Sequence, residues 1–310
     1  MDPTTRRVVV TGASGYVGTH IVDALLGAGH QVLALSRRPV PERPGLRWLH
    51  WDLTQTAPSD LPEATAVVHA AAHVNDWDPW PVQQRVTVNG TARVLAAFPT
   101  ARIVLVSSCS VYPLVKGLVD ESVPPTTRPL SPYPRAKIAQ EELVGARPGS
   151  LILRPHAVYG PGDPTLLPRL SAARVFGRFL VPSGRRTLVH LTHVDLLAAA
   201  CVAAVERPEV TGIVNVADAD ALPALDIVRA ISTANGWPER PLLLGEALTW
   251  TIAVALEAWG HASPARKHPL LTRYSASHVA RSRIFVTTRL DRDLGVAPTA
   301  PRLSTWTLEP

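Results

Sequence analysis

Residues 8–18 read Val-Val-Val-Thr-Gly-Ala-Ser-Gly-Tyr-Val-Gly, and this stretch decides the fold. A run of β-branched residues leads into a glycine-rich turn, and apolar residues at helical spacing follow, which predicts a strand, a tight turn and a helix. Gly12 permits the backbone angles of the turn, Gly15 lets backbone amides approach a pyrophosphate, and Gly18 lets the helix pack closely on the strand. The positive end of the helix dipole then favours an anion. The stretch is typical of a phosphate-binding turn, although its G-x-x-G-x-x-G spacing is one residue longer than the usual dinucleotide fingerprint.

A second strand is expected over residues 31–35, and the residues after it indicate the choice of cofactor. In a dinucleotide-binding fold an acidic residue at this place binds the ribose hydroxyls, whereas an arginine accommodates a 2′-phosphate. Ser36 is followed here by Arg37 and Arg38, and the first acidic residue beyond them is Glu42. The sequence therefore predicts a preference for NADP(H), with NAD(H) still possible. The alternative is that both arginines are ordinary solvated loop charges.

Further strands are expected over residues 46–52, 66–69 and 103–106, and a helix over about 80–98. The strand at 66–69 is followed by Ala70, Ala71 and Ala72. Small residues there let a flat cofactor lie against the backbone, although the start of an alanine-rich helix would give the same pattern. The alternation of strands and helices predicts an α/β fold, a Rossmann-type doubly wound parallel sheet, with the ligand at the carboxyl ends of the strands.

The strand at 103–106 leads into Ser107 and Ser108, and Tyr133 and Lys137 follow on a predicted helix. A spacing of four residues places Tyr133 and Lys137 on one helix face. A free tyrosine has a pKa near ~10, and a neighbouring ammonium group would favour the phenolate and bring that pKa towards neutrality. Ser108 would hydrogen-bond the same substrate oxygen. A tyrosine and a lysine at this spacing are common by chance, but combined with the glycine turn and the serine they indicate acid–base catalysis.

These motifs together resemble the extended short-chain dehydrogenase/reductase family, also called the NAD-dependent epimerase/dehydratase family. The resemblance implies that Tyr133 is the acid–base residue, that Lys137 binds ribose and lowers the tyrosine pKa, and that Ser108 orients the reacting oxygen. It also implies the cofactor-binding residues, which are Gly12, Ser14, Gly15, Tyr16 and Val17 at the turn, Arg37 and Arg38, Asp52 and Leu53 at the adenine, Ala70 and Ala71, Tyr133 and Lys137, and Pro155, His156 and Val158 beside the nicotinamide.

Within that family the chain resembles the 3β-hydroxysteroid dehydrogenase-like branch. This resemblance rests on Asp78-Pro79-Trp80, on Arg154-Pro155-His156, and on the tail that runs from 269–274 to Leu294-Gly295. Two departures affect the substrate side, where Thr87, Cys109 and Ser110 are expected to contact the ligand. Thr87 stands where the family has an active-site asparagine, so a threonine hydroxyl would have to hold the relay water. Pro113 stands where glycine is usual, which would reshape a substrate loop.

Composition narrows the class of protein further. The chain has 310 residues, a net charge of +6 and two cysteines, and nearly all of its basic residues are arginines. The basic residues are scattered without interleaved aromatics, so nucleic-acid binding is not expected. Two cysteines make neither a disulfide framework nor a metal cluster, and no other metal site is expected, which fits a reducing cytoplasm. The polar N-terminus argues against a signal peptide, and the apolar segment at 250–259 is too short to span a membrane, so we expect a buried or lid helix there.

The second half is expected to build a smaller, mostly helical substrate lobe. Residues 1–163 are assigned to the NADP-binding domain, 190–217 return to it, and 164–189 and 218–310 form the lobe. A helix is expected over 166–179, a short strand over 185–190 and a strand over 213–216. The histidines at 190, 193, 261, 268 and 278 lack ligand-like spacing and are expected to be structural or exposed. The family also implies a homodimer, formed through the Tyr133 helix and the helix at 80–98.

The leading hypothesis is an NADP(H)-dependent ketoreductase or secondary-alcohol dehydrogenase that acts on an apolar small molecule, sterol-like or a secondary metabolite. A nucleotide-sugar epimerase, dehydratase or reductase is the main alternative. Such an enzyme needs basic groups to bind a diphosphate, and the second half of the chain contains arginines that could serve. The candidate groups are Arg169, Arg174, Arg178, Arg185 and Arg186. A non-catalytic redox sensor is a weaker alternative, because sensors of this fold usually lose the tyrosine or the lysine.

Overall fold

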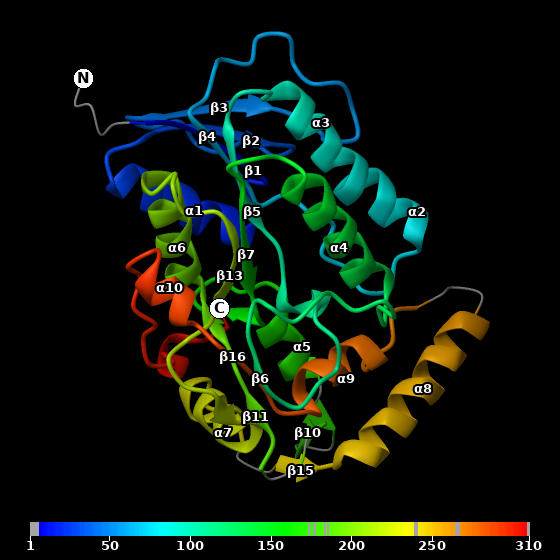
Figure 1. The fold of residues 1–310 in the computed structure, drawn as a ribbon. Helices are drawn as coiled ribbons and strands as arrows, with labels where there is room; N and C mark the ends of the chain where they lie inside the picture. The colour runs from blue at the N-terminus through cyan, green and yellow to red at the C-terminus, as the bar shows by residue number, and fades with distance from the viewer. Residues whose placement is uncertain are drawn as a thin grey trace.

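A central sheet of seven strands organises the molecule. We describe it in a computed structural model that covers residues 6–172, 174–175, 178–182, 184, 186–238, 241–263 and 267–308. The strands are β1 (Arg7–Thr11), β2 (Gln31–Ser36), β3 (Leu46–His50), β4 (Ala66–His69), β5 (Arg102–Val106), β7 (Leu151–Pro155) and β13 (Gly212–Val216). They lie in the order β13-β7-β5-β4-β1-β2-β3, and every neighbouring pair is parallel. The predicted Rossmann-type fold class is confirmed (Figure 1).

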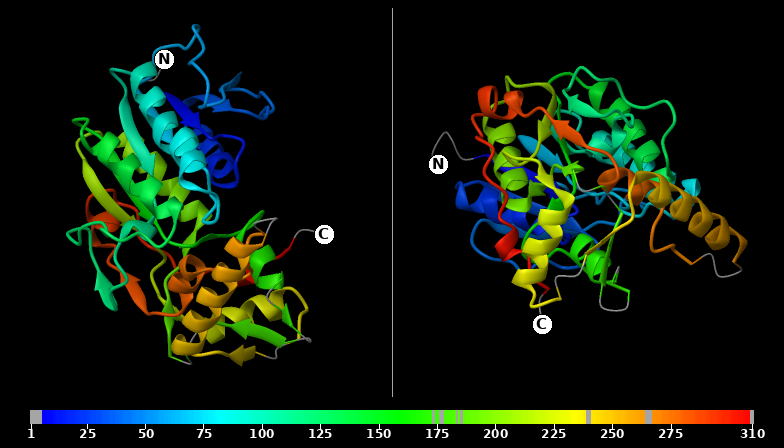
Figure 2. Two further views of the ribbon diagram at one scale, coloured as in Figure 1. Left: turned by 90° about the vertical axis from the view of Figure 1, so that its right-hand side faces the viewer. Right: turned by 90° about the horizontal axis from the view of Figure 1, so that it is seen from below.

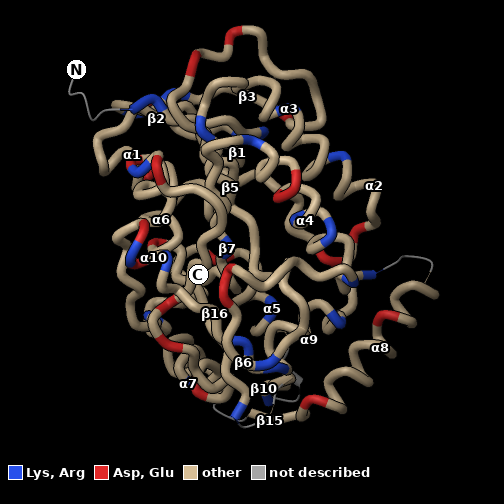
Figure 3. Tube along the Cα trace, in the orientation of Figure 1, with Lys and Arg blue, Asp and Glu red and all other residues tan. Residues whose placement is uncertain are grey.

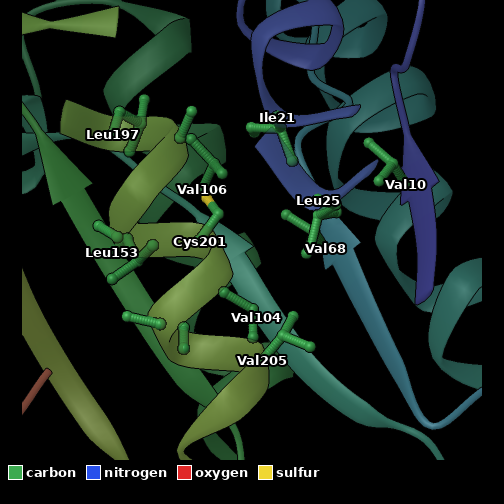
Figure 4. Packing of buried hydrophobic residues seen from close by; sticks show 14 of the residues in the cluster. Val10, Ile21, Leu25, Val68, Val104, Val106, Leu153, Leu197, Cys201 and Val205 are labelled. Atoms are coloured by element: carbon green, nitrogen blue, oxygen red, sulfur yellow. The ribbon is translucent and has the colours of Figure 1, made fainter. Parts of the chain in front are cut away.

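Helices cover both faces of this sheet, which is why its strands are apolar along nearly their whole length. On one face, α1 (Tyr16–Gly27) and α6 (Val194–Glu206) pack through Ile21, Leu25 and Leu197 against strand residues such as Val68 and Val104 (Figure 4). On the other face lie α3 (Asn89–Ala97) and α4 (Pro132–Gly145). The predicted helix at 80–98 is confirmed as α2 (Trp80–Gln83), a π-helical turn η1 (Gln84–Val88) and α3 in succession.

The sheet places the sequence motifs at one edge. From β1 the chain adds β2 and β3 on one side, and β4, β5, β7 and β13 lie on the other. This reversal of direction creates a crevice beyond the carboxyl ends of β1 and β4, where open α/β sheets bind ligands. The glycine turn follows β1, the three alanines follow β4, and Ser108 follows β5.

A second, smaller part of the molecule lies below this edge of the sheet (Figure 2). Its helices are α5 (Leu166–Ala172), α7 (Ala224–Ala234), α8 (Glu246–Ala262) and α9 (Arg273–Val279), and α10 (Thr288–Arg292) returns to the main core. One small sheet has the order β15-β10-β9, with β15 (Pro241–Leu243), β10 (Arg178–Val181) and β9 (Arg174–Val175). Another has the order β14-β11-β16-β6, with β14 (Leu222–Pro223), β11 (Leu188–Val189), β16 (Arg283–Phe285) and β6 (Gly117–Val119). The remaining short elements are β8 (Val158–Tyr159), which pairs with β12 (Thr192–His193), and the 3₁₀ turns η2 (Cys109–Val111) and η3 (Leu303–Thr305).

The helix predicted over 166–179 is wrong in its second half. α5 ends at Ala172, and β10 then pairs in parallel with β15. Phe179 and Val181 are buried while Leu180 between them is less so, which is the two-residue period of a strand. Pairing with a segment some sixty residues away overrode the local helical pattern. The strand predicted over 185–190 is confirmed only at Leu188–Val189, and Arg185 lies outside the described residues.

Helix α8 is only partly buried. Its Trp259 is 62% exposed, and Leu248 and Val254 are about half exposed, whereas Ala253 and Gly260 face the protein. Among the described helices, none has both the length and the apolar character that a membrane span requires. Figure 3 shows Lys and Arg interspersed with Asp and Glu along the whole trace, as the scattered basic residues of the sequence predict.

Asp76 ties the loop after β4 to the smaller part of the molecule. Its carboxylate accepts hydrogen bonds from Thr272 Oγ1 at 2.6 Å and His268 Nε2 at 3.0 Å, and Arg169 lies 3.3 Å away. Thr272 is also the N-cap of α9. Burial alone would raise the pKa of Asp76, but the hydrogen bonds from His268 and Thr272 and the charge of Arg169 lower that pKa to about 2. One buried carboxylate therefore holds three separate segments together.

Candidate active site

The glycine turn is packed too tightly to accept side chains. Gly12 has a φ of 71°, and a Cβ on it would lie 2.9 Å from the Ala71 backbone. A Cβ on Gly18 would lie 2.1 Å from the carbonyl oxygen of Gly12. The first turn of α1 thus lies directly on the turn, and the turn lies directly on Ala70 and Ala71. This is the close backbone approach that the sequence predicts for a dinucleotide site.

The N-terminus of α1 is free to bind an anion. Its N-cap is Gly15, no side chain caps it, and its first turn has no acidic residue. Ser14, Tyr16 and Val17 surround this end, but the Tyr16 hydroxyl is buried against Gly160 rather than at the turn. Unpaired helix amides next to a tight glycine turn fit the pyrophosphate of a dinucleotide.

Of the two arginines after β2, Arg38 is tied to the turn. Its guanidinium donates to the carbonyl oxygen of Ser14 at 2.9 Å, and its own carbonyl oxygen accepts from Ser36 Oγ. Arg37 is exposed, and its charge helps to lower the pKa of Asp52, after the hydrogen bond from the Thr54 backbone amide. These cationic groups border the place where an adenosine ribose would lie in this fold.

Asp52 and Leu53 lie where the chain leaves β3 and approaches α3. A Cβ on Gly90 would lie 3.1 Å from Leu53 Cβ, and the Leu53 carbonyl oxygen accepts from Arg93. This contact keeps the expected adenine-binding residues against the helix that follows β4.

Tyr133 and Ser108 come together at the carboxyl end of β5. Burial raises the pKa of the Tyr133 hydroxyl to about 12, and the adjacent Ser108 hydroxyl lowers it by a smaller amount. Ser108 also caps η2, because its Oγ accepts from the Ser110 amide at 3.1 Å. Tyr133 is therefore protonated at neutral pH and is poised to donate a hydrogen bond.

Lys137 makes different contacts from those that the sequence predicts. Its Nζ donates to the carbonyl oxygen of Val106 at 2.9 Å and to Gln140 Oε1 at 2.8 Å. Burial lowers the pKa of its ammonium group to about 7, and Glu141 acts in the opposite direction. Burial rather than Lys137 controls the pKa of Tyr133 in this structure.

Gln140 extends these contacts into a buried polar network that the sequence analysis missed. Because its Oε1 accepts from Lys137, its Nε2 faces His69 Nε2 at 3.0 Å and Thr91 Oγ1 at 2.8 Å. His69 Nε2 is then the acceptor, and its Nδ1 donates to Thr11 Oγ1, which is 2.6 Å away. Burial lowers the pKa of His69 to about 3, so the ring is neutral. The only sequence signal was the position of Gln140, seven residues after Tyr133 on the same helix.

A buried ion pair joins α4 to β7. Arg154 donates to both carboxylate oxygens of Glu141, at 2.9 and 2.5 Å, and Ser107 donates to the same carboxylate at 2.5 Å. β7, α4 and the residue that follows β5 are thereby joined through one buried carboxylate.

The residues expected beside the nicotinamide lie on a strained bend. Pro155 ends β7, Val158 begins β8, and Ala157 between them has a φ of 45°, in the left-handed region. His156 is buried, and both of its ring nitrogens are engaged, Nδ1 with the His190 carbonyl oxygen and Nε2 with His278 at 2.9 Å. His156 therefore supports the wall of the site.

A cavity of about 210 Å³ lies next to Tyr133. Its lining is Ser110, Tyr112, Leu114, Thr126, Arg128, Leu130, Pro134, Tyr274, Ser277 and Arg283. Tyr274 packs edge-on against Tyr133, with 5.8 Å between the ring centroids. The sequence did not predict Tyr274 and Arg283 as site residues, because Tyr274 belongs to the 269–274 tail that carried only the family resemblance and Arg283 has no local motif.

Two of the expected substrate residues do not line this cavity. Cys109 is fully buried in a core cluster, and its Sγ lies 3.1 Å from the Arg154 carbonyl oxygen. The hydroxyl of Thr87 accepts from the His73 amide and donates to Gln83 Oε1, so it stabilises the loop after β4 instead of facing a ligand. Ser110 does line the cavity. Over the described residues, no group of three or more His, Cys, Asp or Glu side chains is placed to hold a metal ion.

The comparisons with known proteins agree with this geometry. The family model described as the NAD dependent epimerase/dehydratase family matches residues 8–217. The chain belongs to this family. Membership of the epimerase/dehydratase family confirms the predicted resemblance and makes the protein an NAD(P)-dependent enzyme of the short-chain dehydrogenase/reductase type.

The similar proteins include enzymes named as reductases or dehydrogenases and a solved structure in complex with a nucleotide sugar. It is 28% identical to a 2-alkyl-3-oxoalkanoate reductase of Stenotrophomonas maltophilia, over 94% of both chains. It is 29% identical to a 3 beta-hydroxysteroid dehydrogenase/Delta 5-->4-isomerase of Mycobacterium tuberculosis, over 94% of this chain and 86% of that one. The solved structure of MoeE5 in complex with UDP-glucose and NAD is similar with a TM-score of 0.75, 27% identity and 97% coverage of both chains.

Proposed function

We propose that this protein is an NADP(H)-dependent ketoreductase, or the reverse secondary-alcohol dehydrogenase, acting on a largely apolar small molecule. The observation that carries the proposal is the position of Tyr133, which lies beside the Ser108 hydroxyl and packs against Tyr274, a residue that lines a cavity together with Leu114 and Leu130. The relatives named as an oxoalkanoate reductase and a hydroxysteroid dehydrogenase support the same reaction class.

Tyr133 and Ser108 are proposed to act on the carbonyl oxygen of the substrate. The nicotinamide, when bound, supplies the hydride that reduces the carbonyl carbon. Tyr133 gives a proton to the carbonyl oxygen, and its raised pKa keeps it protonated at neutral pH and available for this transfer. Ser108 hydrogen-bonds the same oxygen and holds it beside the phenol.

Lys137 is proposed to hold the ribose of the cofactor and to restore the proton of Tyr133. Its pKa of about 7 means that it exchanges protons at neutral pH. Lys137 is on the helix that carries Tyr133, and its contacts with Val106 and Gln140 hold its Nζ at the end of β5. Pro155 and Val158 would flank the nicotinamide on the opposite wall.

The preference for NADP(H) is part of the proposal. The contact between Arg38 and Ser14 supports it, because it places a guanidinium group between the end of β2 and the phosphate-binding turn. No acidic side chain stands at the end of β2, where a preference for NAD(H) would require one.

A nucleotide-sugar enzyme is the second candidate, and the similarity to MoeE5 in complex with UDP-glucose favours it. The arginines expected to bind a diphosphate give it little support. Arg169 pairs with Asp76, Arg178 is exposed on β10, and Arg186 is exposed. Arg185 and the side chain of Arg174 lie outside the described residues.

The homodimer implied by the family is also part of the proposal. α2, α3 and α4 lie side by side on one face of the sheet (Figure 1), and the Arg135 guanidinium stacks 3.8 Å from the Trp80 ring centroid there. Light scattering of the purified protein measures whether two copies associate.

Replacement of Tyr133 tests the proposed reaction. We expect Tyr133→Phe to reduce NADPH-dependent reduction of apolar ketones by roughly 10²–10⁴-fold, because the proton donor is lost. NADPH affinity, measured by nicotinamide fluorescence, should stay within a factor of two of wild type. Full activity of the variant would contradict the proposed mechanism. Copurified NAD together with turnover of UDP-glucose would favour the second candidate.

A further inference from the structure

Arg283 is a buried cation without a carboxylate partner. It lies on β16, is 3% exposed, and lines the cavity beside Tyr133. One of its terminal nitrogens donates to the Ser277 carbonyl oxygen at 3.3 Å, while its Nε is buried and has no acceptor. Across the part of the chain that the structure describes, no Asp or Glu forms an ion pair with it.

Such an arrangement is unfavourable unless a ligand completes it. A guanidinium group cannot lose its proton at neutral pH, and it presents a planar fork of donors that matches a carboxylate. Burial without an opposing charge is expensive, and buried polar groups in proteins nearly always find partners. Burial lowers the pKa of Arg283, in agreement with this expense. Arg154, by comparison, satisfies the same requirement with Glu141.

The rest of the cavity suits a molecule with one anionic end. Ser110, Ser277 and Tyr274 contribute polar groups to the same lining as Arg283, and Leu114, Leu130 and Pro134 supply apolar surface. Tyr274 and Pro134 also adjoin Tyr133, since Tyr274 packs on its ring and Pro134 follows it in α4. Tyr274 therefore contacts the proposed proton donor and lines the same cavity as the unpaired cation.

We propose that the substrate is a hydroxy or keto acid whose carboxylate binds Arg283 while its carbonyl or hydroxyl group meets Tyr133. This inference rests on the proposed function and names the substrate class for the same site. In this proposal the carboxylate lies a few bonds from the reacting carbon, because Tyr274 lines the cavity with Arg283 and also packs on Tyr133. The apolar remainder lies along Leu114 and Leu130. A diphosphate is the other source of negative charge, and Arg128 also lines the cavity. Arg128 is exposed to solvent, however, so Arg283 is the buried cation of this lining, and the cavity volume is about 210 Å³.

The test compares a charged substrate with its neutral analogue. We expect the wild-type protein to oxidise 3-hydroxydecanoate with NADP⁺ roughly 10–100-fold more efficiently in kcat/KM than methyl 3-hydroxydecanoate, the range that a hydrogen-bonded charged group contributes. Arg283→Met should remove this preference, so that the acid and the ester are oxidised with similar kcat/KM. Arg281→Gln is the nearby control, because Arg281 pairs with Glu246 and donates to the Leu114 carbonyl oxygen but does not itself line the cavity. An acid preference that survives in Arg283→Met would overturn the proposal.

Stability measurements separate a ligand-binding role from a structural one. Because Arg283→Met removes an unpaired buried charge, its melting temperature should equal or exceed that of wild type. A lower melting temperature with an unchanged acid preference would make Arg283 structural and reject the inference. If Arg283→Met does not fold, Arg283→Lys is tested in its place. The lysine keeps the positive charge but lacks the planar pair of guanidinium donors, so this variant should retain only part of the acid preference.

Binding experiments distinguish failure of this inference from failure of the proposed function. If wild type oxidises neither compound, the reaction is wrong, but decanoate should still raise the melting temperature of wild type and not that of Arg283→Met. Absence of that shift would reject the carboxylate site by itself. A shift that depends on Arg283 and appears with UDP-glucose instead of decanoate would assign the cation to a diphosphate and overturn the proposal.

Discussion

At the scale of single residues, Arg37 and Arg38 differ in a way that the sequence does not reveal. Arg38 contacts the phosphate-binding turn, whereas Arg37 is exposed near Asp52. We expect Arg38→Ala to weaken NADPH binding by roughly two- to fivefold, about the value of an exposed charged contact, with little effect on NADH. Arg37→Ala should have a smaller effect. Titrations by nicotinamide fluorescence measure both, and equal affinities of wild type for NADPH and NADH would contradict the predicted NADP preference.

Gln140 is a positioning residue, because it touches Lys137 and His69 but none of the proposed reacting atoms. Gln140→Leu leaves Lys137 and His69 without this buried hydrogen-bond partner. We expect the free energy of unfolding to fall by about 1–3 kcal/mol and the activity to decrease. Gln140→Glu keeps an acceptor for Lys137 and adds a negative charge, which raises the pKa of the lysine. The pH profile of kcat/KM should therefore move to higher pH in Gln140→Glu. An unmoved profile would show that Gln140 does not act through Lys137.

At the scale of elements, the two glycines of α1 provide a matched pair. A Cβ on Gly18 would clash with the Gly12 carbonyl oxygen, whereas a Cβ on Gly27 meets nothing within 4 Å. Gly18→Ala should therefore separate the helix from the turn and abolish NADPH binding. It should lower the free energy of unfolding by about 3 kcal/mol or more, the upper end of the usual cost of overpacking. Gly27→Ala should be neutral or stabilise by up to about 1 kcal/mol, because alanine favours helix. Urea unfolding and NADPH titration measure both variants, and similar behaviour of the two would refute the close packing of the turn.

At the scale of the whole molecule, Asp76 links the sheet to the smaller part, and its titration controls that link. Its folded pKa of about 2 lies below the ordinary value of 3.8, so its contribution is complete above about pH 4 and is lost as the pH falls towards 2. The hydrogen bond to Asp76 raises the pKa of His268, so the histidine contribution is lost as the pH rises through that raised value. The stabilisation by this pair is therefore greatest between about pH 4 and the ordinary histidine pKa near ~6.5.

The variant Asp76→Asn isolates this contribution. We expect its free energy of unfolding to lie about 2–3 kcal/mol below wild type at pH 5, and the difference to shrink by pH 2, because one unit of pKa shift corresponds to about 1.4 kcal/mol. Urea unfolding at pH 2, 5 and 8 measures the difference. A difference that does not change with pH would contradict the role of the Asp76 charge.

The sequence by itself determined the central sheet apart from β7, the glycine turn and the choice of Ser108, Tyr133 and Lys137 as candidate residues. These features depend on local periodicity, on the conformational freedom of glycine and on spacing along one helix, all of which can be read from neighbouring residues. Gln140 lay within the same helix, but only the fold showed that it faces His69 and Thr91.

Only the tertiary structure decided the strand that replaces the second half of the predicted 166–179 helix, the contacts of Lys137 and the place of Arg283 beside Tyr274. Each of these depends on segments far apart in the chain that share one buried volume. β10 is a strand because β15 pairs with it, and Lys137 bonds Val106 because α4 packs at the end of β5. A local pattern contains no information about which distant side chain will fill a cavity, so the chemistry next to Tyr133 emerged only when the chain was folded.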